Sequence, residues 1–204
     1  MMYRVMIGYL FVLFDVVFKL TDAGNKADLF PDFIGFLLIF WGMWGFRKES
    51  ERWKQLVVGI GVAFVYTYAA YILDMFGVLS KIPELAILAV SVGSDLLKMI
   101  SIYLFTNVIK DMEKKRGNLQ STKMIMIWRI MFICYFAQYL FISMQQAEIA
   151  FFLFSKLAVF TFLFYIFTTG NLISLQKRNM TAASDKNISK YAGNFKHTKN
   201  GGKQ

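Results

Sequence analysis

The chain has 204 residues, of which 57% are hydrophobic and 18% are charged, and its formal net charge is +10. Ordinary soluble domains are about 45–50% apolar and about 25% charged, so this composition argues against a soluble domain. A single Cys and a single His argue against a disulfide framework, a CxxC redox pair and a histidine-based metal site, and no metal or other cofactor is expected.

Six apolar blocks follow one another along the chain, and a membrane-spanning helix needs about 20 mostly apolar residues. The pattern therefore predicts an all-α, polytopic membrane bundle of about six transmembrane helices in residues 1–173. The predicted spans are residues 3–20, 31–46, 55–76, 85–109, 124–144 and 149–173.

The first block resembles a signal peptide in having Arg4 before an apolar run, but Asp15 interrupts it and no A-x-A cleavage site follows. We expect it to be retained as a short first helix. Asp15 and Lys19 are spaced i, i+4 with the acid first, which favours a pair on one helix face.

Pro31, Asp32 and Gly35 open the second predicted helix. Pro suits the first position of a helix, and an acid in the first turn complements the positive end of the helix dipole. A small residue such as Gly35 allows another helix to approach closely. We interpret these three residues as a helix-start motif, and this explanation accounts for Asp32 without a catalytic role.

The segment LFPDFIGFLLIF resembles the L-x-P-D-F-I-G-Y/F-x-L-I segment of uncharacterised multi-pass membrane proteins of low-GC Gram-positive bacteria. The resemblance covers about a dozen residues and carries no catalytic signature. It implies a bacterial cytoplasmic-membrane protein with several spans, and it supplies no activity.

The fourth predicted span contains Asp95 and Lys98 near its middle. A charge at bilayer depth costs about 2.5–3.5 kcal/mol, which nearly cancels the gain from the apolar residues of this span. At helical spacing, both residues share a stripe with three serines, so we expect the stripe to face the bundle interior or a wet cavity. The stripe consists of Ser91, Ser94, Asp95, Lys98 and Ser101.

Further ionisable residues occur near the ends of other spans, namely Asp74 in the third and Lys156 in the sixth. Two interpretations stay open. In the first, Asp95 and Lys98 form a structural ion pair, to which Lys156 or Asp74 from a neighbouring helix adds a further charge. In the second, the ionisable residues form a functional polar site. The candidate residues for that site are Asp15, Asp74, Asp95, Lys98 and Lys156.

Residues 174–204 are polar and carry a net charge of +6, so we expect a disordered basic tail. With six spans and an internal amino terminus, seventeen Lys and Arg residues lie on the inner side and three on the outer side. This bias predicts a cell-membrane protein with both termini in the cytoplasm. We expect no nucleic-acid partner.

No HExxH, GxSxG, P-loop or Cys/His ligand spacing is present, so the sequence favours a non-enzymatic protein without catalytic residues. The first interpretation is an accessory or interaction protein that serves a membrane partner. The alternative is a protein that binds or transports a small solute through a charged pocket open to the outside. Substrate-binding subunits of bacterial vitamin importers are similar in size, span count and orientation, although the first helix here lacks their A-x-x-x-A pattern.

Overall fold

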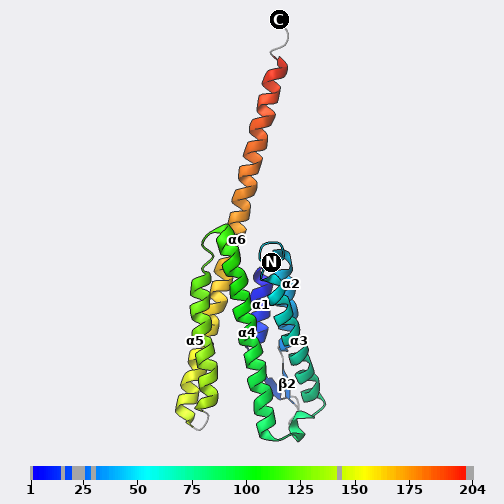
Figure 1. The fold of residues 1–204 in the computed structure, drawn as a ribbon, viewed down its shortest axis with the longest axis vertical. Coiled ribbons are helices and arrows are strands. Elements are labelled where there is room, and N and C mark those ends of the chain that lie inside the picture. The colour runs from blue at the N-terminus through cyan, green and yellow to red at the C-terminus, as the bar shows by residue number, and fades with distance from the viewer. Residues whose placement is uncertain (1, 15–16, 20–25, 29–30, 142–143, 201–204) are drawn as a thin grey trace.

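The computed structural model describes residues 2–14, 17–19, 26–28, 31–141 and 144–200. Each helix packs against the next one in the chain, and the first also packs against the last, which closes a ring (Figure 1). The helices are α1 (Met2–Leu13), α2 (Asp32–Met43), α3 (Trp53–Met75), α4 (Glu84–Arg116), α5 (Ser121–Leu140) and α6 (Gln145–Asn200).

Successive helices alternate in direction, so the bundle has two distinct ends (Figure 1). The amino terminus, the α2–α3 connection and the α4–α5 connection lie at one end, from which α6 projects. We call this the amino-terminal end of the bundle. The α3–α4 and α5–α6 connections lie at the opposite end.

Four helical segments are long and apolar enough to cross a membrane, and they are α3, α4, α5 and residues 149–180 of α6. Many of their apolar side chains point outward, such as Val58 and Val65 on α3 and Phe154 and Phe164 on α6. A soluble protein rarely exposes so much apolar surface. These features identify the molecule as a helical bundle suited to a lipid environment.

The first helix is shorter than predicted and ends at Leu13, whereas α2 continues as a 3-10 turn, η1 (Trp44–Phe46), to the predicted end of the second span. The twelve residues of α1 rise about 18 Å, and α2 with η1 rises about 24 Å. Both lengths are less than the hydrocarbon core of about 30 Å. The prediction of one helix over residues 3–20 is therefore wrong at its carboxyl end.

Residues after α1 form a strand instead. Strand β1 (Val17–Lys19) pairs antiparallel with β2 (Lys26–Asp28), with Phe18 opposite Ala27. The sequence offers a reason, because Val17 and Phe18 are residue types that favour a strand. The all-α prediction thus misses one small two-stranded hairpin.

Helices α1 and α2 cross with their backbones in close contact. A Cβ atom added at Gly8 would lie 2.6 Å from the carbonyl oxygen of Gly35, and one added at Gly35 would lie 2.6 Å from that of Gly8. Only glycine fits at either position. The expectation that Gly35 admits a neighbouring helix agrees with this geometry.

An aromatic cluster joins α1 to α4 and α6 in the core. The ring of Tyr9 meets the rings of Phe105 and Phe162 edge-on, at centroid distances of 5.3 and 5.6 Å. The hydroxyl of Tyr9 donates a hydrogen bond to the carbonyl oxygen of Ser101 at 3.1 Å. The core therefore fixes α1 against the middle of α4.

Helix α4 extends beyond its predicted end at residue 109, because residues 110–116 are good helix formers. It ends at Gly117, whose φ of 87° suits a residue without a side chain. Glu113 then accepts hydrogen bonds from the backbone amides of Leu119 and Gln120 and from the Ser121 hydroxyl. These bonds fix the start of α5.

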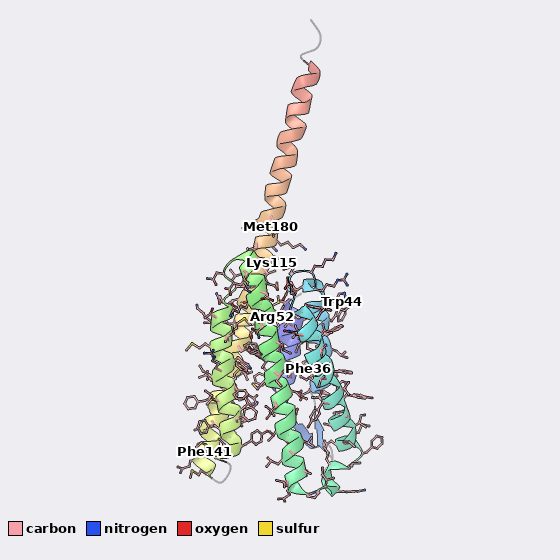
Figure 2. All side chains as sticks on the ribbon, viewed as in Figure 1. Phe36, Trp44, Arg52, Lys115, Phe141 and Met180 are labelled. Atoms are coloured by element: carbon pink, nitrogen blue, oxygen red, sulfur yellow. The ribbon has the colours of Figure 1, made fainter. Side chains whose placement is uncertain are left out.

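Helix α6 also continues further than predicted and reaches Asn200, whereas we expected residues 174–204 to be disordered (Figure 1). Residues 171–192 contain neither Gly nor Pro. Extending an existing helix avoids the cost of nucleating a new one, so a polar segment can remain helical beyond an apolar span. In Figure 2, Met180 marks the level at which α6 has left the other helices.

Candidate functional site

The polar stripe of α4 runs from the surface into the bundle. Lys98 and Ser101 are buried, Ser94 and Asp95 are half-buried, and Ser91 is exposed. Lys98 lies about 21 Å along α4 from Glu84 and about 27 Å from Arg116, so its backbone sits near the middle of the helix.

Lys98 forms ion pairs with two carboxylates. Its Nζ atom lies 2.9 Å from Oδ2 of Asp32 on α2 and 3.9 Å from Oδ1 of Asp95 on α4. The side chain of Lys98 is only 5% exposed, so the two carboxylates, rather than water, stabilise its positive charge. We call Asp32, Asp95, Lys98 and Tyr139 the central ionic cluster.

Asp32 is the closer of the two acidic partners, and the sequence interpretation missed this role. Its place at the first residue of α2 complements the helix dipole, as expected. In addition, its side chain is 14% exposed and reaches across to Lys98 on another helix. Only the folded chain brings these two residues together, because 65 positions separate them.

Tyr139 on α5 completes the cluster, and the sequence analysis did not single it out. Its hydroxyl donates a hydrogen bond to Oδ2 of Asp95 at 2.6 Å. A partly buried tyrosine hydroxyl usually finds a polar partner, but this rule does not say which one. The cluster therefore links α2, α4 and α5.

Lys156 lies at the end of α1. Its Nζ atom donates to the carbonyl oxygen of Leu13 at 3.2 Å and lies over the rings of Phe14 and Phe152, at 5.7 and 5.2 Å from their centroids. A cation at the carboxyl end of a helix interacts favourably with the helix dipole.

Asp74, another predicted site residue, does not join the cluster. Asp74 is exposed at the end of α3 and forms no ion pair with any residue that the structure describes. Asp15 lies outside the described residues. The structure thus brings Asp95 and Lys98 together, adds Asp32 and Tyr139, and places Lys156 at the end of α1.

An open groove between α4 and α5 leads to the cluster. It has a volume of about 740 Å³, and we call it the α4–α5 groove. Most of its wall is apolar, while the polar groups come from Glu84, Ser91 and Tyr139. Its lining residues are Glu84, Leu85, Ile87, Leu88, Ser91 and Tyr139.

The ends of two short helices meet polar side chains deep in the bundle. Helix α2 begins at Asp32, beside Lys98, and α1 ends at Leu13, beside Lys156. Membrane transporters commonly place such helix ends near the bilayer midplane, where the helix dipoles and unpaired backbone groups contact solutes. In this chain, the start of α2 and the end of α1 each contact a lysine side chain from another helix.

No protein-family model, curated protein or solved structure matches the chain. The fold and the composition define a helical protein with four helices capable of crossing a membrane. The resemblance drawn from the LFPDFIGFLLIF segment stays a prediction.

Proposed function

We propose that this protein binds a small solute in the α4–α5 groove and that the central ionic cluster forms the inner end of the binding site. The observation that carries this proposal is the position of Tyr139. This side chain lines the groove and also donates its hydroxyl to Asp95 at 2.6 Å. A solute in the groove therefore lies one hydrogen bond away from a carboxylate within the bundle.

The charges favour a cationic solute. The cluster combines the carboxylates of Asp32 and Asp95 with the ammonium of Lys98, and among the residues that the structure describes, Glu84 is the one charged residue that lines the groove. Asp95 is also the more distant acidic partner of Lys98, at 3.9 Å against 2.9 Å. The apolar wall suits an organic body, so the proposed solute is a small organic ammonium compound.

The charge distribution along the chain supports an orientation in the cell membrane. The connections rich in Lys and Arg, within residues 47–54 and 110–123, lie at the amino-terminal end of the bundle (Figure 1). Positive residues favour the cytoplasmic side, so both termini are proposed to be cytoplasmic and the groove to open outward. Helices α1 and α2 run in opposite directions, so the chain enters α3 on the side where α1 began. The proposed orientation of α3–α6 is therefore the same whether or not α1 and α2 cross the membrane.

Native mass spectrometry of the purified protein tests the proposal. Ser91→Trp places a bulky side chain in the groove, while Ile133→Trp on α5 adds the same group at a position that is 63% exposed outside the groove lining. We expect wild type and Ile133→Trp to retain a small organic cation and Ser91→Trp to lose it.

Absence of such an adduct from wild type, or its retention by Ser91→Trp, would contradict solute binding in the groove. A phospholipid adduct that Ser91→Trp alone removes would also contradict it, because the groove would then be occupied by membrane lipid. Thermal unfolding of all three proteins checks that each is folded.

A second candidate function is that of a non-enzymatic accessory protein, and the projecting part of α6 favours it. The helix continues to Asn200, beyond the contacts that it makes with the bundle (Figure 1). A basic helix in that position offers a docking segment for a membrane protein partner. A stoichiometric protein that co-purifies with the full chain, but not with a chain ending at residue 180, would support this function.

A further inference from the structure

A second hollow lies at the amino-terminal end of the bundle, where the α2–α3 connection faces the end of α4. Its volume is about 490 Å³. Figure 2 shows Trp44, Arg52 and Lys115 near this end, whereas Phe141 lies at the opposite end. We call it the basic pocket, and its lining residues are Arg47, Lys48, Ser50, Glu51, Trp53, Lys54 and Lys115.

Ion pairs and hydrogen bonds hold the pocket walls in place. Arg116 binds Glu49 through two nitrogens, at 2.6 and 2.8 Å, and Lys115 donates to the backbone oxygen of Glu49 at 2.7 Å. Arg52 lies 3.6 Å from Asp111 and donates to Asn107 at 3.0 Å. These bonds attach the α2–α3 connection to α4, so the pocket has a defined shape.

The same ion pairs neutralise the nearby carboxylates, so the side chains that face the pocket are mostly positively charged. Glu49 is paired with Arg116, and Asp111 with Arg52. By contrast, Arg47, Lys48 and Lys54 are exposed and form no ion pair with a residue that the structure describes. Four basic side chains and one acid, Glu51, therefore line the pocket, which favours an anion.

Exposed tryptophans occur next to the pocket. Trp44, directly after α2, is 45% exposed and lies 5.5 Å from the pocket residue Trp53, between ring centroids, and Trp41, in the last turn of α2, is 60% exposed. Tryptophan is enriched at membrane–water interfaces, where one part of the ring contacts apolar chains and the N–H contacts water. The guanidinium of Arg47 lies over the Trp44 ring, 5.2 Å from its centroid.

We propose that the basic pocket binds the phosphate group of an anionic phospholipid from the adjacent leaflet. Lys48, Lys54 and Lys115 contact the phosphate, and Arg47 is held over Trp44 at the pocket edge. The acyl chains then extend along the exposed surface of Trp44. A free phosphate would use the same cations, but it would gain nothing from this apolar ring.

Lipid binding by charge-matched variants tests this proposal. Lys48→Gln/Lys54→Gln removes two positive charges from the pocket, and Lys110→Gln/Lys123→Gln removes two from exposed positions outside its lining. Each protein is placed in phosphatidylcholine nanodiscs with increasing phosphatidylglycerol, and bound phosphatidylglycerol is counted by native mass spectrometry. All four lysines are exposed, so both variants are expected to fold, and gel filtration checks this.

We expect the pocket variant to bind phosphatidylglycerol at least about tenfold more weakly than wild type, since it loses two direct contacts with the phosphate. The control variant should stay within about twofold of wild type, because its two lysines lie outside the pocket lining and do not contact the phosphate. Equally weak lipid binding by the two variants would contradict a specific site in the basic pocket, because non-specific electrostatic attraction would then explain the binding. Displacement of the lipid by millimolar inorganic phosphate would overturn the assignment to a lipid.

Discussion

Lys98→Met is expected to destabilise the protein by about 3–5 kcal/mol, because it leaves two carboxylates in the bundle without their shared cation. Lys98 is the partner of both Asp32 and Asp95, at 2.9 and 3.9 Å. The measurement is the melting temperature in detergent together with the monodisperse fraction after extraction. Of the single substitutions in the central ionic cluster, this one should have the largest effect.

The neutral triple variant is the control for this prediction. Replacing Asp32 and Asp95 by Asn in the Lys98→Met background removes every formal charge from the cluster, so much of the lost stability should return. Among single acid variants, Asp32→Asn should cost more than Asp95→Asn, since Asp32 lies closer to Lys98. A triple variant as unstable as Lys98→Met would show that charge pairing does not hold the cluster together.

Gly8→Ala is expected to cost about 1–3 kcal/mol or more, since the new methyl group would lie 2.6 Å from the carbonyl oxygen of Gly35. Backbone atoms cannot move aside as a flexible side chain can, so α1 and α2 must separate. Gly35→Ala should have a similar effect for the same reason. The free energy of unfolding in a denaturant series in detergent measures both.

Gly61→Ala on α3 provides the matched control, because nothing lies within 4 Å of the position of its added Cβ atom. Alanine is the better helix former, so this variant should equal or slightly exceed wild type in stability. The double variant Gly8→Ala/Gly35→Ala should cost less than the sum of the single variants, since both disturb one crossing. Near-neutral effects at Gly8 and Gly35 would contradict the close backbone contact.

The long apolar helices could be predicted from the sequence because hydropathy is a local property. The predicted third span, residues 55–76, lies close to α3 at Trp53–Met75. The limits of α1 and α6 could not be placed in the same way. After Leu13 the strand β1 competes with helix, while α6 continues past Ile173 without needing apolar residues.

Only part of the candidate site was predictable for a related reason. Asp95 and Lys98 are one turn apart on the same helix, so their pairing follows from helical geometry. The contact between Asp32 and Lys98 and that between Tyr139 and Asp95 depend on how α2 and α5 pack on α4. Hydropathy gives no information about that packing, so Asp32 was assigned to the helix dipole alone.

Thiol labelling from outside intact cells tests most directly whether the α4–α5 groove is open to water on the external side. In a Cys134→Ala background, Ser91→Cys lies in the groove, about 10 Å along α4 from Glu84. Ile133→Cys lies about 10 Å along α5 from Leu140 and faces outward. The two thiols thus have similar depth and different surroundings, and Lys110→Cys marks the opposite end.

A membrane-impermeant, charged maleimide should label Ser91→Cys in intact cells and leave Ile133→Cys unlabelled, because a thiol in lipid is neither hydrated nor ionised. Lys110→Cys should react only after the cells are opened. Equal rates at positions 91 and 133, or reaction at 91 only in opened cells, would contradict an outward-facing solute site.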